Sequence, residues 1–265
     1  MTLLERIPPL QRGLQHLSSI VWLLVETVQE TVEHMVARKR PPFRLSVFFD
    51  QTDRAGVGSI PLISLVSFFL GLTMALLTGY QLRTFGTERL VPGLVAIAFT
   101  RELGPLMTGI MLAARIGAAY TAELGTMTVA EEVEAIEAMG IGPLRFLVSP
   151  RVLAVVLLMP CLVVVSNLAA LLGGMLVSRW QLNISPSYFF QLVQEAVQNR
   201  DIIAGMIKSL LFGLIISLVA CYKGLTVSGG AAGVGNATTS SVVTAITVVI
   251  GFDTLANIIL VALYD

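Results

Sequence analysis

Long apolar runs recur along this sequence at the length that a helix needs to cross a lipid bilayer. A hydrocarbon core of about 30 Å takes about 20 residues at 1.5 Å per residue. Four clear runs and one less regular run meet this condition, so the pattern predicts five membrane spans. The predicted spans cover residues 60–80, 103–124, 153–177, 202–221 and 242–263.

The second span is the least regular of the five. The apolar stretch 90–127 is too long for a single crossing and is interrupted by charged residues. These are Arg101, Glu102, Arg115 and Glu123. We therefore place the crossing at 103–124, and we predict a shorter helix over 91–100 that dips into or lies along the outer interface.

Residues 1–44 carry a different pattern, in which apolar residues recur at alternating spacings of four and three with polar residues between them. This spacing predicts an amphipathic helix that ends at Pro41 and Pro42. An interfacial helix along the inner leaflet is favoured, because the stretch leads into the basic residues 38–40 and then into a span. The same spacing also fits a coiled-coil seam. Residues 45–265 then form the five-span domain.

Composition supports a membrane protein. Hydrophobic residues make up 55% of the chain and charged residues 13%, with a mean hydropathy of +0.83. The predicted fold class is therefore an all-α integral membrane protein. A formal net charge of zero gives no bulk field to attract nucleic acid, so no nucleic-acid partner is expected.

The chain offers little material for catalysis or metal binding. Cys161 and Cys221 both lie in apolar runs, which argues against a disulfide framework and a thiolate metal site. The histidines, His16 and His34, both lie in the N-terminal stretch. No metalloprotease, paired-aspartate or serine–lysine motif occurs in or near a span. We expect no catalytic residues, no metal and no cofactor.

The loop after the second span predicts a short helix outside the bilayer. Thr128 and Glu131 have the spacing of a capping box, and Gly140 with Pro143 should end the helix. About eleven residues span on the order of 16 Å, too short to cross a membrane, and the glutamates oppose burial in lipid. Because most loop lysines and arginines lie on the same side when the N-terminus is cytoplasmic, this helix should be cytoplasmic and Asp265 periplasmic.

The short helix carries an apolar stripe among its acidic residues. The stripe consists of Val129, Val133, Ile136 and Met139. It either packs back on the chain's own cytoplasmic loops or docks on another protein. Docking is favoured, because five spans leave little cytoplasmic mass of the chain's own to cover the stripe.

Four motifs resemble those of the MlaE/YrbE family of ABC-transporter permeases, and the resemblance covers about residues 45–263. The motifs are RELGP at 101–105, TAELGTM at 121–127, EEVEAIEAMG at 131–140 and PLRFLVSPRVLA at 143–154. The resemblance implies a homodimeric permease in an inner membrane, with an interfacial N-terminal helix and five spans per subunit. It also implies a periplasmic MCE-domain partner and movement of phospholipid, or a similar lipid, between inner and outer membranes.

The same resemblance implies that the short helix, at about 128–140, couples the permease to a cytoplasmic ATPase. The coupling residues expected on this basis are Glu131, Glu132, Val133, Glu134, Ile136, Glu137, Met139 and Gly140. The sequence agrees with a separate source of energy, since it contains no phosphate-binding loop ending in Gly-Lys-Ser/Thr. Its glycine-rich run at 229–235 has no following lysine, and we interpret it as a flexible turn between the last two spans. ATP should bind to the partner.

Charged residues within the spans are candidates for substrate binding, because an unpaired charge in hydrocarbon is costly. Lys208 and Asp253 lie at similar predicted depth and have the opposite charges needed for a pair. Arg101 and Glu102 are adjacent, so they point about 100° apart on a helix. All four either form structural ion pairs or surround the polar end of a lipid cavity, with Arg101 or Lys208 facing a phosphate.

Two aromatic residues lie near the outer end of the first span. The family resemblance implies that Tyr80 and Phe85 contact acyl chains. Aromatic residues are also enriched at both interfaces of any membrane protein, and this simpler interpretation is slightly favoured.

Two other functions compete with an ABC permease. In an ion-coupled secondary transporter of an amphipathic substrate, Lys208, Asp253 and Glu102 would form an ion or proton relay. The odd number of spans, the absence of a visible inverted repeat and the acidic docking helix argue against it. A structural anchor for another complex is the third possibility.

Overall fold

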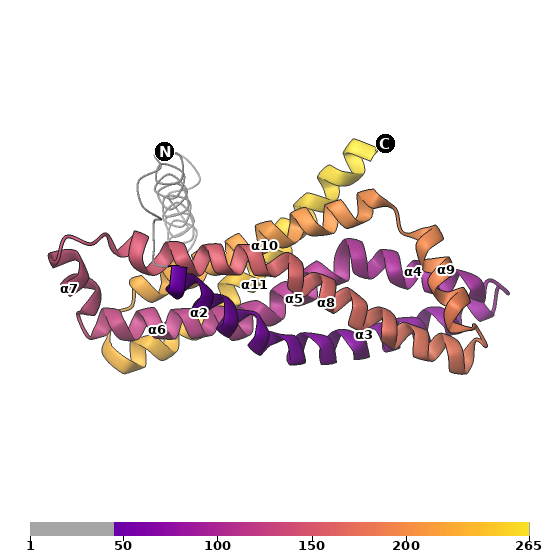
Figure 1. Cartoon of the computed structure of the whole chain (residues 1–265), viewed down its shortest axis with the longest axis horizontal. Helices are drawn as coiled ribbons and strands as arrows, with labels where there is room; N and C mark the ends of the chain where they lie inside the picture. Colours follow the sequence, from indigo (N-terminus) through magenta and orange to yellow (C-terminus); the bar gives the residue numbers. More distant parts are fainter. Residues whose placement is uncertain (1–44, 265) are drawn as a thin grey trace, which may run out of the picture.

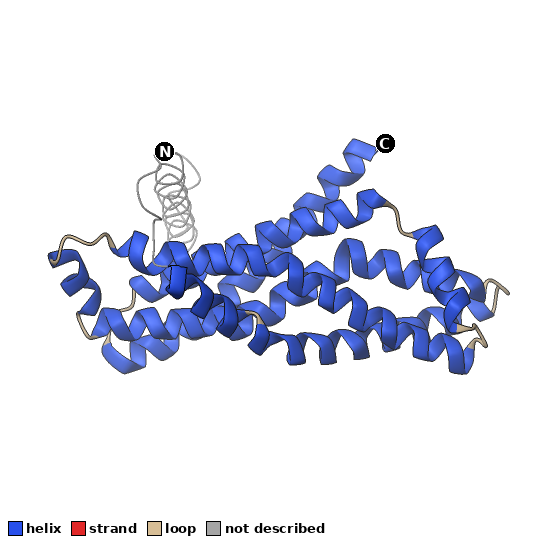
Figure 2. Cartoon of the chain, in the orientation of Figure 1, coloured by secondary structure: helices blue, strands red, loops and turns tan. Residues whose placement is uncertain are grey.

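A computed structural model describes residues 45–264, with side chains from 50 to 259, and in this range the chain is helical with no strand (Figure 2). The predicted amphipathic helix over 1–44 lies outside the described residues. The helices form an elongated bundle, with α7 at one end and α4 and α9 at the other (Figure 1). The predicted all-α membrane fold is confirmed.

The helices follow one another with short connections. The α-helices are α2 (Leu45–Ala55), α3 (Ile60–Arg83), α4 (Val91–Ala98), α5 (Gly104–Leu112), α6 (Ala118–Val129), α7 (Glu132–Ala138), α8 (Ser149–Gln181), α9 (Pro186–Ala196), α10 (Asn199–Leu225) and α11 (Gly230–Tyr264). Two 3₁₀ turns, η2 (Val57–Ser59) and η3 (Glu88–Leu90), and three π-helical turns, η4 (Phe99–Leu103), η5 (Ala113–Gly117) and η6 (Leu144–Val148), join them.

Five segments of the described chain are long and apolar enough to cross a membrane, as predicted. They are Asp50–Arg83, Glu88–Val129, Leu144–Gln181, Asn199–Leu225 and Gly230–Ile259. Their outer faces expose large apolar side chains such as Leu65, Phe69 and Leu77 of α3. Such faces are unfavourable in water and suit contact with lipid.

The second span differs from its prediction. The helix predicted over 91–100 is present as α4, but it is not a separate helix, because η4 and η5 connect α4, α5 and α6 into one segment of 42 residues. In η4 the backbone N–H of Gly104 donates to the carbonyl of Phe99, five residues back. Such turns re-aim a helix while keeping its backbone groups hydrogen-bonded, which a membrane requires.

Helices α3 and α8 pack backbone against backbone. A Cβ atom on Gly71 would overlap the carbonyl of Ala170, and one on Gly173 would overlap the carbonyl of Phe68. Beside these contacts the buried hydroxyls of Ser67 and Ser166 form a 2.7 Å hydrogen bond. Small residues and hydroxyl pairs of this kind hold helices together where the surrounding lipid is as apolar as the side chains.

The centre of the bundle is a continuous apolar core shared by α5, α8, α10 and α11. Leu112, Met159, Phe212, Ile216 and Val249 are all fully buried there. At one end of the bundle, α9 begins after Ser185, whose hydroxyl accepts a hydrogen bond from the backbone N–H of Tyr188. This N-cap hydrogen bond fixes the residue at which α9 begins.

Candidate functional site

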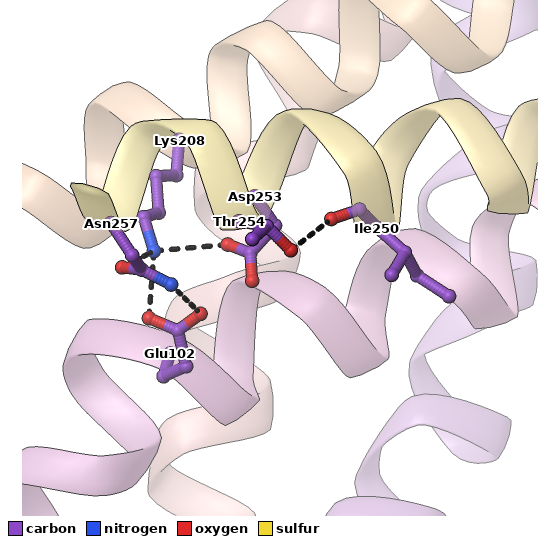
Figure 3. Close-up of polar contacts among 6 residues, drawn as sticks. All are labelled: Glu102, Lys208, Ile250, Asp253, Thr254 and Asn257. Carbon is purple, nitrogen blue, oxygen red and sulfur yellow. Dashed lines mark hydrogen bonds and ion pairs between the residues drawn. The ribbon is translucent and has the colours of Figure 1, made fainter. Parts of the chain in front are cut away.

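Lys208 lies at the centre of a polar network between three segments. Its Nζ atom donates to Glu102 Oε2 at 2.7 Å, to Asp253 Oδ1 at 2.9 Å and to Asn257 Oδ1 at 2.7 Å (Figure 3). Asn257 Nδ2 in turn donates to Glu102 Oε1 at 2.7 Å. We call these four residues the Lys208 network.

The fold brings this network together from distant parts of the chain. Glu102 lies in the π-helical turn η4, Lys208 lies in α10, and Asp253 and Asn257 lie one turn apart on α11. The side chain of Lys208 is 3% exposed and that of Asp253 is 9% exposed, whereas Glu102 is 28% exposed. The network is therefore almost closed, and Glu102 is the ionic group that is most open to the surroundings.

The charges of the network do not balance. One ammonium faces two carboxylates, and an ammonium has three N–H donors. All three donors of Lys208 are engaged by the contacts above. Lys208 therefore offsets the repulsion between the two carboxylates, and it has no donor left for a further anion.

The structure confirms one predicted contact among the candidate substrate-binding residues. The predicted pairing of Lys208 with Asp253 is present, and Glu102 joins it. Arg101 is half-buried and forms no hydrogen bond or ion pair with the Lys208 network.

Sequence reasoning missed Asn257. An uncharged amide in an apolar run gives little signal, although its position four residues after Asp253 places both on one helix face. A scan for polar residues one turn from each buried charge would have found it.

The two predicted aromatic contacts lie apart from this network. Tyr80 is 77% exposed and Phe85 is 78% exposed, at and just beyond the end of α3. Neither points into the bundle. Their exposure at the end of α3 suits both an interfacial aromatic belt and contact with an acyl chain.

The two remaining charges of the second span have different partners. Arg115 Nη1 donates to Ser59 Oγ at 2.8 Å, which ties η5 to the start of α3. Glu123 pairs at 3.1 Å with Arg151, whose side chain is 6% exposed and lies over the ring of Tyr120. Both contacts connect neighbouring helices, and the Glu123–Arg151 contact is a structural ion pair.

Helix α7 is shorter than predicted, with seven residues rather than about eleven. The predicted capping box is wrong, because the Thr128 hydroxyl donates instead to the carbonyls of Leu124 and Gly224. α6 therefore continues to Val129. The chain then turns at Glu131, whose φ of 60° lies in the left-handed region that non-glycine residues rarely adopt.

The end of α7 is as predicted. Gly140 has a φ of 75°, its N–H bonds to the carbonyl of Glu137, and the N–H of Ile141 bonds to the carbonyl of Ile136. These two bonds form a Schellman motif, for which glycine is the preferred residue. Gly140 therefore ends α7 because its positive φ angle directs the chain out of the helix.

Two residues of the apolar stripe pack on the chain's own bundle, and the other two are exposed and available to another protein. Val133 and Ile136 are half-buried against the apolar cluster around Leu124 and Leu147. Val129 is 41% exposed and Met139 is 68% exposed. The four glutamates of this segment are also exposed; they are Glu131, Glu132, Glu134 and Glu137. The bundle therefore holds α7 by one face and leaves an acidic face with an apolar edge open.

The glycine-rich run differs from its prediction as a flexible turn. Gly229 and Gly230 have positive φ angles and form the turn, but α11 already begins at Gly230. Residues 231–235 therefore continue as helix. Among residues 45–264, no group of three histidine, cysteine, aspartate or glutamate side chains has an arrangement that could hold a metal ion.

Five long apolar helices enclosing a charged network, with a short acidic helix at one end, define a multi-pass helical membrane protein. Residues 48–259 match the family model described as Permease MlaE. A probable ABC transporter permease protein of Rickettsia typhi is 37% identical over 204 residues, which cover 77% of this chain and 79% of the relative. Another, of Synechocystis sp., is 35% identical over 197 residues, covering 74% of this chain and 75% of the relative.

A plant protein is similar as well. The chloroplastic protein TRIGALACTOSYLDIACYLGLYCEROL 1 of Arabidopsis thaliana is 37% identical over 193 residues, covering 73% of this chain and 55% of that protein. The chain belongs to the MlaE permease family of ABC transporters. It is a permease and not itself an enzyme, and the resemblance drawn from the four sequence motifs is confirmed.

Proposed function

We propose that this chain is the lipid-moving permease subunit of an ABC transporter in an inner membrane. It acts as a homodimer with a separate cytoplasmic ATPase and a periplasmic MCE-domain protein, and it moves phospholipid or a similar lipid between inner and outer membranes. The observation that carries this proposal is α7. It is too short to cross a bilayer, is held by its own bundle through Val133 and Ile136, and presents exposed glutamates and Met139.

The exposed face of α7 suits a basic protein surface with an apolar hollow. Glu134 and Glu137 supply the charge and Met139 supplies an apolar side chain that adapts well to a partner. On this basis α7 is the cytoplasmic coupling helix that receives movement from the ATPase. The N-terminus is then cytoplasmic and the C-terminus periplasmic, because five spans separate them.

A lipid cargo is supported by the chemistry of the spans and by one relative. The Lys208 network is a compact polar group inside an apolar bundle, as a lipid with a polar head and apolar tails would require. The name of the Arabidopsis relative refers to trigalactosyldiacylglycerol, a glycerolipid. Tyr80 and Phe85 are proposed to contact acyl chains from the outer end of α3.

The Lys208 network changes which cation should meet a lipid phosphate. The three donors of Lys208 are engaged, whereas Arg101 forms no hydrogen bond or ion pair with the network. We therefore assign the phosphate contact to Arg101, with Glu102 beside it at the open side of the network. Lys208 and Asp253 position Glu102.

An ion-coupled secondary transporter is the second candidate function. It is favoured by the direct contact of Lys208 with two carboxylates within the spans, an arrangement that suits a proton or ion relay. Such a transporter would work without an ATPase, so a partner search separates the two.

The proposal is tested by purifying the tagged full-length protein from its native membranes and identifying the proteins that accompany it. An ABC permease brings an ATPase with it in a constant ratio. A preparation without any ATPase, together with transport that follows an ion gradient, would replace the proposal with the secondary transporter.

A further inference from the structure

A cavity of about 380 Å³ lies between α8, α9 and α10, at the end of the bundle opposite α7. It is separate from the Lys208 network, none of whose residues lines it. Its walls come from the outer half of α8, the first turns of α10, the end of α9 and Thr100 of η4, and they are almost entirely apolar.

The mouth of the cavity opens sideways through apolar side chains. Val164 and Leu168 of α8 and Ile202 of α10 line it and are 40%, 57% and 44% exposed. All three lie in helices that cross the membrane. The cavity therefore opens toward the hydrocarbon of the bilayer, where water is scarce and lipid chains are the solvent.

The size of the cavity limits what can fill it. A helix about 10 Å across displaces roughly 400 Å³ in each 5.4 Å turn, so the cavity holds less than one turn of a partner's helix. A methylene group is close in size to a water molecule, about 30 Å³, so the cavity has room for roughly a dozen of them. One acyl chain fits and a transmembrane helix does not.

Two polar groups distinguish a phospholipid from a plain hydrocarbon. Asn167 lines the cavity, and its Oδ1 atom is buried without a hydrogen-bond partner against the backbone of Gly104, where a Cβ atom would overlap it. The N–H groups of the same amide are donors, and they suit the ester oxygens of a glycerolipid, which only accept hydrogen bonds. Gln194 is exposed at the edge formed by α9 and gives the cavity a polar rim.

The inner wall of the cavity is shared with the Lys208 network. A Cβ atom on Gly205 would overlap the carbonyl of Thr100, so α10 and η4 touch through their backbones at this wall. Lys208 lies one helical turn beyond Gly205, and Glu102 lies two residues beyond Thr100. Whatever fills the cavity rests against the two turns that carry the network.

We propose that this cavity is a lateral binding site for one membrane phospholipid, with an acyl chain between α8 and α10 and its ester region at Asn167. The lipid enters from the leaflet on the α9 side. It supports the Thr100–Gly205 wall and so the position of Glu102. The site requires only the membrane location of the chain and does not depend on the direction or energy source of transport.

The test measures phospholipid retained per chain, by mass spectrometry, after the full-length protein is purified in mild detergent without ATP. Leu168→Trp fills the mouth, and the matched control Leu172→Trp places the same side chain one turn along α8, at a residue that is 49% exposed and does not line the cavity. We expect Leu168→Trp to lose about one phospholipid per chain relative to both the control and the unaltered protein.

A second variant tests the ester contact. Asn167→Leu should weaken phospholipid retention roughly five-fold in a detergent titration, the loss expected for one hydrogen bond. Equal phospholipid in Leu168→Trp and Leu172→Trp would overturn the proposal. So would finding only free fatty acid or detergent, or losing a partner protein from Leu168→Trp while phospholipid is unchanged. Because no transport is measured, none of these results depends on the ATPase.

Discussion

Lys208 Nζ lies 2.7 Å from Glu102 Oε2, although the two residues are 106 positions apart in the sequence. The π-helical turn η4 carries Glu102 toward α10, where α10 and η4 touch at Gly205 and Thr100. All three donors of Lys208 are engaged in this network, and Glu102 is its most exposed ionic group.

Removing the cation should be far more damaging than removing one carboxylate charge. Lys208→Met leaves Glu102 and Asp253 as two unpaired like charges, which should lower the free energy of unfolding by about 3–5 kcal/mol. Asp253→Asn keeps an acceptor oxygen and should cost much less. Thermal unfolding in detergent compares the two variants. If the Lys208→Met protein has the same melting temperature as the unaltered protein, the network does not stabilise the bundle.

Asn257 should contribute through its hydrogen bonds to both Lys208 and Glu102. Asn257→Leu removes the donor to Glu102 Oε1 and should cost about 1.5–3 kcal/mol, the range for a hydrogen bond to a charged group. Thr254→Val is the matched control, because Thr254 is exposed and its hydroxyl bonds only to the carbonyl of Ile250 on the same helix. The control should change stability by less than about 0.5 kcal/mol. Similar melting of the two variants would contradict the role of Asn257.

The packing of α3 on α8 should depend on the absence of side chains at Gly71 and Gly173. Alanine at either position would overlap a carbonyl of the facing helix and should separate the two helices. Gly251→Ala is the control, since a Cβ there meets open space within α11 and should stabilise the helix by about 0.5–1 kcal/mol. Melting temperatures that rise in all three variants would show that α3 and α8 are not held at this distance.

Charge reversal on α7 should weaken the ATPase complex without disturbing the membrane bundle. Glu134→Lys with Glu137→Lys reverses two exposed charges, and Glu195→Lys reverses an exposed charge on α9 at the other end of the molecule. Co-purification of the ATPase should fall at least ten-fold in the α7 variant and stay unchanged in the α9 variant. Equal recovery from both would remove the coupling role of α7.

The number and approximate positions of the membrane spans could be predicted because they depend on the local sequence. Apolar runs of the length of a bilayer identified all five spans, and the opposite charges of Lys208 and Asp253 in neighbouring spans predicted their contact. The end of α7 at Gly140 was predictable for the same reason, since the turn itself requires glycine.

The remaining details depend on tertiary contacts that one sequence does not display. The hydroxyl of Thr128 bonds to Gly224 on α10 instead of capping α7, which no local motif indicates. The π-helical turns leave no recognisable sequence pattern, so the second span was predicted with a break that the structure replaces by η4. Asn257 was missed because a single amide in an apolar helix does not indicate a functional site until its hydrogen-bond partners are known.

The central claim is tested most directly by reconstituting the purified permease and its ATPase in liposomes and following labelled phospholipid. The account predicts movement that needs ATP hydrolysis and stops when Glu134→Lys and Glu137→Lys are introduced together, with the liposomes intact and no ion gradient imposed. Lipid movement that continues without ATP and instead follows a proton or sodium gradient would contradict it.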